Sequence, residues 1–195
     1  MASLRLDEAL LEVVGFLEDR KVPYMVIGGF ANLFWGRSRL TRDLDLTVSL
    51  PEERLAPLVE DLRQRFTVLP SDPLEFVRRH SILPMQVGEV RVDLARAGLP
   101  YEEGAIRRAR PVDVAGRSIK VCSPEDLIIH KIISDRPQDR EDVREIVRRQ
   151  GENLDRRYLD PIVEEFSRVL ERPDILAFYE QCLGPVDERN PSSGL

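Results

Sequence analysis

Apolar residues recur along the chain with two different spacings, and each spacing predicts a different kind of element. Residues 4–19 place leucine or valine every three to four positions, as on one face of a helix. Residues 43–49 alternate instead, with leucine and valine on one side and Asp43, Asp45 and a threonine on the other. Strict alternation is typical of a strand that buries one face.

Extended along the chain, these patterns predict an α/β half followed by a helical half. The first half is expected to contain helices at 4–19, 30–35 and 52–65, strands at 24–27, 43–49, 66–69, 82–87 and 90–95, and a hairpin of 112–115 with 118–121. Ser123 and Pro124, followed by two acids, mark a helix start, and that helix runs to about residue 134. Further helices are expected at 138–149, 156–170 and 174–182. We therefore divide the chain into a core at 1–121, a helical region at 123–183 and a disordered tail at 184–195.

Composition excludes several classes of protein. No apolar run is long enough to span a bilayer, and the first residues do not resemble a secretion signal, so we expect a cytoplasmic protein without a membrane partner. With only two cysteines and two histidines in 195 residues, any metal site must be built from carboxylates, which favour hard cations. The net charge of −6 argues against a surface that binds nucleic acid throughout, although paired arginines leave local contacts open.

The most informative acids are Asp43 and Asp45 on the strand at 43–49, because residues two apart on a strand point to the same side. Two carboxylates that close repel each other unless a cation neutralises them, and a divalent ion does so well. Asp93 repeats the pattern on a later strand, with apolar neighbours facing the other way. Taken alone, each acid is more often an ordinary surface side chain than a metal ligand.

Residues before the acids provide groups suited to phosphate. Gly28 and Gly29 end the strand at 24–27, and glycine lets the backbone approach an anion closely. Arg37, Arg39 and Thr41 come shortly before the acids, where they can contact a triphosphate.

Together, these residues resemble the signature of the nucleotidyltransferase superfamily. The pattern is an apolar residue with Gly-Gly, then Asp-x-Asp, then a later strand with Asp93, and the lead-in Arg39-x-Thr41-x-Asp43-x-Asp45 is similar to the small branch that includes AbiEii-type toxins. The resemblance covers roughly residues 20–150. It implies a mixed β-sheet flanked by helices, one or two Mg²⁺ ions on Asp43, Asp45 and Asp93, and a nucleoside triphosphate over the glycines. Many relatives have Gly-Ser where this chain has Gly-Gly, so backbone and arginine groups would have to replace the serine hydroxyl.

A lysine in the helical half has two interpretations. Residues 127–133 are apolar nearly throughout, so Lys131 is costly to bury unless it reaches an anion or extends to water. The set Lys131, Arg136, Asp139 and Asp142 also resembles a segment of AbiEii-type enzymes, in which the lysine and one aspartate belong to the active site. That resemblance implies a nucleotide contact for Lys131 and for Asp139 or Asp142, without deciding between the two acids.

The sequence therefore predicts a Mg²⁺-dependent enzyme that moves a nucleoside monophosphate to an acceptor hydroxyl, with Asp43, Asp45, Asp93 and Lys131 as catalytic residues. A toxin-like protein would modify tRNA or a protein and would have an antitoxin partner. One alternative is an enzyme that modifies aminoglycoside or lincosamide antibiotics. Another is a non-catalytic module that only binds nucleotide, against which three clustered carboxylates argue.

Overall fold

The computed structural model describes residues 5–134 and 136–184, so the tail expected at 184–195 lies outside the described residues except for Gly184. The chain divides into two compact units. The sheet unit contains the described residues up to Phe34 together with Ser38–Ser123. The helical unit contains Trp35–Arg37 and the described residues from Pro124 onward.

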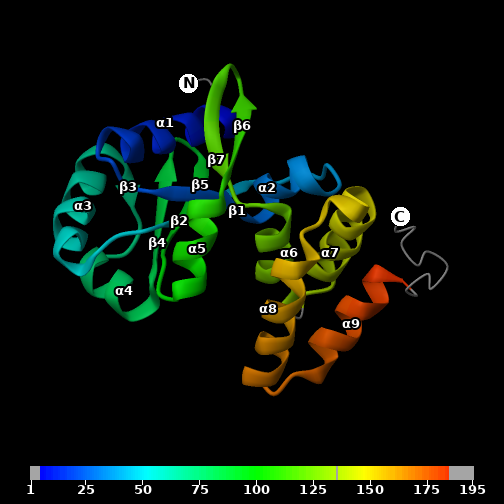
Figure 1. The fold of residues 1–195 in the computed structure, drawn as a ribbon. Coiled ribbons are helices and arrows are strands. Elements are labelled where there is room, and N and C mark those ends of the chain that lie inside the picture. The colour runs from blue at the N-terminus through cyan, green and yellow to red at the C-terminus, as the bar shows by residue number, and fades with distance from the viewer. Residues whose placement is uncertain (1–4, 135, 185–195) are drawn as a thin grey trace, which may run out of the picture. The chain divides into compact units, whose positions relative to one another are not determined.

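Seven strands of the described chain form one mixed sheet in the order β3-β4-β5-β2-β1-β7-β6 (Figure 1). β2 pairs parallel with β5, and β1 pairs parallel with β7, whereas the other neighbours are antiparallel. The strands are β1 (Tyr24–Ile27), β2 (Asp43–Val48), β3 (Thr67–Val68), β4 (Ile82–Val87), β5 (Val90–Arg96), β6 (Arg110–Val114) and β7 (Arg117–Val121). The expected mixed sheet with flanking helices is therefore confirmed.

Five helices begin in the sheet unit. They are α1 (Leu6–Asp19), α2 (Gly28–Trp35), α3 (Glu52–Arg65), α4 (Pro73–His80) and α5 (Pro100–Arg108). The apolar face expected for residues 4–19 is fully buried at Leu10, Val13 and Leu17, where α1 packs on the sheet. The alternation expected for 43–49 is observed as well, because Leu44 and Leu46 have no exposed surface. These apolar positions fix which face of each element carries the polar residues.

The helical unit consists of α6 (Pro124–Ile132), α7 (Pro137–Gln150), the 3₁₀ turn η1 (Gly151–Asn153), α8 (Arg156–Val169) and α9 (Pro173–Leu183). α6 is apolar nearly all round because it contacts both α7 and α8. Polar groups at its start also bond within the unit: Tyr158 Oη donates to Asp126 Oδ1 at 2.7 Å, and Asp155 N–H donates to Glu125 Oε1 at 3.0 Å. None of the described helices combines the length and the apolarity that crossing a membrane requires.

Two helices were not expected from the sequence. α4 begins at Pro73 after Asp72, whose carboxylate accepts a hydrogen bond from the backbone of Glu75 at 3.1 Å. α5 begins at Pro100, and Glu102 reaches back to accept a hydrogen bond from the Leu99 N–H at 2.9 Å. Both starts carry ordinary capping signals, but helices of eight and nine residues are too short to show a clear apolar repeat. The structure also starts α2 at residue 28 rather than 30 and ends α6 at residue 132 rather than 134.

Candidate active site

The register between β2 and β5 sets the geometry of the three acids. Asp45 lies directly opposite Asp93, and Asp43 lies directly opposite Arg91. Facing residues of paired strands project to the same side of a sheet, and residues two apart on one strand do so as well. Asp43, Asp45 and Asp93 therefore share one face, while the intervening residues Leu44, Leu46, Val92 and Leu94 are buried.

Gly28 lies against the second of these acids. β1 is antiparallel to β2, and its last residue, Ile27, faces Asp45. At Gly28 the backbone has a φ of +68°, a conformation that favours glycine. A Cβ atom added there would lie 2.0 Å from Asp45 Oδ2, so a bare backbone is required for this carboxylate to occupy its position.

Gly29 is covered by the loop that leads into β2. A Cβ added at Gly29 would lie 2.6 Å from Thr41 Oγ1 and 3.4 Å from Arg39 Nη2. The hydroxyl of Thr41 also donates to Asp43 Oδ1 at 3.2 Å. The structure therefore brings Gly28, Gly29, Arg39 and Thr41 together beside the acids at the start of α2. Arg37 belongs instead to the helical unit, where its charge acts on Glu145.

Two of the carboxylates have different partners, because Asp43 accepts a hydrogen bond from Thr41 and Asp93 pairs with Arg91. Among the described residues, no three carboxylate, imidazole or thiol groups form a ready-made metal cage. Asp93 is turned toward Arg91, whose Nε donates to its two oxygens at 3.1 and 3.3 Å. The donor set still fits Mg²⁺, since it offers only carboxylate oxygens, from adjacent strands and on one face. Arg91 is a polar neighbour that sequence reasoning missed: its spacing of two from Asp93 places both side chains on one face of the strand, but only the structure shows that they pair.

Lys131 in the helical unit is buried and forms two ion pairs. Its Nζ lies 2.6 Å from Asp142 Oδ2 and 3.0 Å from Asp139 Oδ1, and all three side chains are at most 6% exposed. Arg136 Nε adds a contact of 2.6 Å to the other oxygen of Asp139. Burial raises the pKa of Asp139, but hydrogen bonds from Ser134, Lys131 and Arg136 outweigh it and hold that pKa below its usual value. Lys131 is therefore neutralised by two aspartates of the same unit instead of extending to water, and its expected contact with nucleotide stays a prediction.

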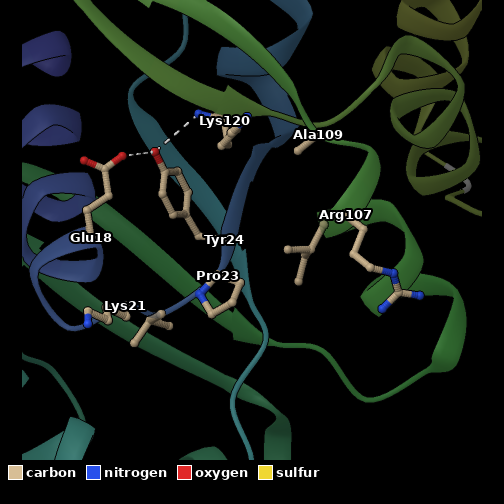
Figure 2. Close-up of a pocket in the computed structure, with 9 residues that line it drawn as sticks. Glu18, Lys21, Pro23, Tyr24, Arg107, Ala109 and Lys120 are labelled. Atoms are coloured by element: carbon tan, nitrogen blue, oxygen red, sulfur yellow. Dashed lines mark hydrogen bonds between the residues drawn. The ribbon is translucent and has the colours of Figure 1, made fainter.

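A separate hollow of about 420 Å³ lies at the other end of β1 (Figure 2). There Tyr24 faces Val48, three residues from the end of β1 that faces Asp45. Its hydroxyl donates to Glu18 Oε1 at 2.9 Å and accepts from the backbone N–H of Lys120 at 3.3 Å, as the dashed lines in Figure 2 show. Burial is the main reason that the pKa of Tyr24 is raised, so the phenol is neutral at physiological pH. None of the three acids lines this hollow.

The contact between Gly28 and Asp45 leads to a prediction about alanine substitutions. Gly28→Ala should destabilise the protein by about 1–3 kcal/mol more than Gly116→Ala, because the new methyl group displaces the carboxylate. Gly116 is a matched control: its φ is +82°, so alanine is strained there as well, but a Cβ would meet nothing within 4 Å. Urea unfolding of both variants and the parent measures the difference. Equal losses of stability would contradict the close contact.

Comparisons with known proteins complete the description. A family model described as nucleotidyl transferase of unknown function (DUF2204) matches residues 6–172, while a search of curated proteins finds no significant match. Among solved structures, the chain is similar to an antigenic nucleotidyltransferase-like protein from Paracoccidioides brasiliensis, with a TM-score of 0.53 and 17% identity over 91% of this chain and 94% of that one.

Two further solved structures share the fold. The antibiotic-resistance factor ANT(2'')-Ia has a TM-score of 0.58 and 16% identity, covering 89% of this chain and 97% of its own. The lincosamide antibiotic adenylyltransferase LnuA, solved with lincomycin bound, has a TM-score of 0.53 and 14% identity, covering 74% of this chain and 98% of its own. At these identities the likeness establishes the fold alone.

Proposed function

The chain belongs to the family of nucleotidyl transferases of unknown function (DUF2204), and on that premise we propose that it transfers a nucleoside monophosphate from a nucleoside triphosphate to an acceptor hydroxyl with the help of Mg²⁺. The observation that carries this proposal is the placement of three aspartates from two adjacent strands on one face, beside a glycine corner. Families that keep only the fold have no need of that arrangement.

Asp43, Asp45 and Asp93 would hold one or two Mg²⁺ ions. Metal ions in such sites stabilise the charge of the transferring phosphate and lower the pKa of the attacking hydroxyl. All three candidate ligands are carboxylates, the ligand type that Mg²⁺ prefers. Asp93 is also suited to accept the proton of the acceptor hydroxyl, because it lies at the edge of the cluster on its own strand.

The triphosphate would be bound by the groups around Gly29. The start of α2 presents backbone N–H groups that lack helical partners, which favours an anion there. Arg39 and Thr41 lie over the same glycine and add a positive charge and a hydroxyl donor. These groups would take the place of the serine found in many relatives. Contacts of Arg37, Lys131, Asp139 and Asp142 with nucleotide stay predictions, and the ion pairs of Lys131 support a role in organising the helical unit as well.

For the acceptor, the toxin-like hypothesis names tRNA or a protein, with an antitoxin as regulating partner. The hypothesis came from the resemblance to AbiEii-type toxins, and the paired arginines favoured RNA as the acceptor. In the structure several of these are neutralised by neighbouring acids, such as Arg79 by Glu75 and Arg148 by Glu145. The arginine pairs therefore give an RNA acceptor little support, and tRNA and a protein hydroxyl both remain hypotheses for the acceptor.

The alternative acceptor is a cationic small molecule such as an aminoglycoside, and the distribution of charge favours it. Residues 124–183 contain 15 acidic and 10 basic side chains, whereas residues 1–123 contain equal numbers of both. The helical unit therefore carries most of the net charge and would attract a polycation. Glu164 and Glu165 are both exposed and contribute to this excess. One solved neighbour of the same fold was captured with adenylyl-2''-tobramycin.

The test is a transfer assay with purified protein, Mg²⁺ and each of the four nucleoside triphosphates labelled at the α-phosphate. Total RNA, a protein extract and a panel of aminoglycosides and lincosamides are supplied separately. We expect label to move to one acceptor class, with no transfer in EDTA. Label on an antibiotic would select the small-molecule alternative, and label on RNA or protein would select the toxin-like one. Absence of transfer to every acceptor, together with no thermal shift by any nucleotide, would overturn the proposal.

A further inference from the structure

Arg91 places a fixed positive charge inside the acidic cluster. It projects to the same face as Asp93, two residues along β5, and it lies directly opposite Asp43 on β2. Its guanidinium contacts Asp93 through two nitrogens, with Nε 3.1 Å and Nη2 3.1 Å from Oδ1. The guanidinium of arginine carries a permanent positive charge.

The carboxylate of Asp93 is the less exposed member of the pair. Its side chain is 18% exposed, against 55% for Arg91, so the acid is held in place while the guanidinium can move into solvent. Arg91 occupies the same carboxylate oxygens that a metal ion would need.

We propose that Arg91 is an internal counterion that competes with the divalent ion for Asp93 and thereby sets the metal concentration at which the site fills. This inference rests on the proposed function, because it takes Asp43, Asp45 and Asp93 as the metal ligands. Without metal, the guanidinium offsets the repulsion among three carboxylates. When the ion binds, Arg91 must leave Asp93. The free energy of the broken ion pair opposes binding, so the affinity for the metal is lower. Arg91 is thus a positioning residue that acts through Asp93.

The test measures binding of Mn²⁺ alone to the full chain by electron paramagnetic resonance, without nucleotide. Arg91→Gln should bind Mn²⁺ more tightly, on the order of fivefold, as expected when a partly exposed ion pair no longer competes. Arg91→Lys keeps the charge but not the two-nitrogen contact, so its affinity for Mn²⁺ should lie between that of the parent and that of Arg91→Gln. Arg79→Gln is the matched control: it removes one exposed arginine of the same unit, paired with Glu75 on α4, and should change the affinity less than twofold.

A second measurement separates competition from a loss of folding. In EDTA, Arg91→Gln should melt below the parent because the acids repel each other, and Mn²⁺ should raise its melting temperature by more than it raises that of the parent. Unchanged or weaker Mn²⁺ binding by Arg91→Gln would overturn this inference while leaving the metal site intact. A parent protein that binds no Mn²⁺ at millimolar concentration would overturn the metal site itself, and this inference with it.

Discussion

Asp45→Asn should reduce nucleotidyl transfer by roughly a thousandfold or more, while the protein stays folded. Asp45 is the central acid of the proposed site, flanked by Asp43 on its own strand and by Asp93 across the sheet. A metal ion supplies several kcal/mol of charge stabilisation in such reactions, and about 4 kcal/mol corresponds to a factor of a thousand in rate. Asparagine keeps the shape of the side chain next to Gly28 but removes the charge that would hold the proposed ion.

The measurement is the initial rate of label transfer with saturating Mg²⁺ and nucleotide, alongside thermal melting without metal. Removing one of three neighbouring negative charges relieves repulsion, so the melting temperature without metal should not fall. Glu53→Gln is the control, since it removes one exposed acid of the same unit and should leave the rate unchanged. A rate for Asp45→Asn within tenfold of the parent would show that this carboxylate is not a metal ligand.

Lys131→Met should destabilise the protein by about 3–5 kcal/mol. Methionine fills a similar volume, but it leaves Asp142 and Asp139 without the ammonium group that lies between them. Removing one member of a buried ion pair leaves an uncompensated charge, which is far more costly than losing a surface pair. Arg136 still contacts Asp139, so that carboxylate keeps one positively charged neighbour.

Urea unfolding of this variant is compared with that of Arg148→Gln, which breaks an exposed pair with Glu145 in the same unit and should destabilise the protein far less. Adding Asp142→Asn to Lys131→Met should recover part of the stability, because the side chain at 142 then carries no charge at the position that has lost its ammonium neighbour. If Lys131→Met is as stable as the parent, the buried lysine has no structural role, and the nucleotide contact becomes its better explanation.

The strands that carry the acids could be predicted because buried apolar residues alternate with polar residues along them. At β2 and β5 every second residue is apolar and buried, so the alternate positions had to carry whatever function the strands support. The glycines added a second, independent signal, since a glycine pair directly after a short strand indicates a position where a side chain is not tolerated. The structure gives the cause as the Asp45 carboxylate and the Thr41 hydroxyl.

The remaining features depend on contacts that no local pattern reports. The pairing of Arg91 with Asp93 depends on side-chain conformation, and an arginine on a strand is more often an ordinary surface residue. The two ion pairs of Lys131 join α6 to α7, so they follow from helix packing rather than from the run of apolar residues around the lysine. The helices α4 and α5 were missed because each is formed by its caps and packing over little more than two turns.

Because Asp45 lies so close to Gly28, the residues at these two positions constrain each other during evolution. While a carboxylate remains at 45, almost any mutation at codon 28 that adds a side chain is penalised, whatever its polarity. A gene copy that has lost the acid at 45 escapes this clash, although the positive φ of residue 28 still disfavours a side chain there. Among descendants of this sequence, a side chain at 28 is therefore expected mainly in lineages that no longer carry an acid at 45.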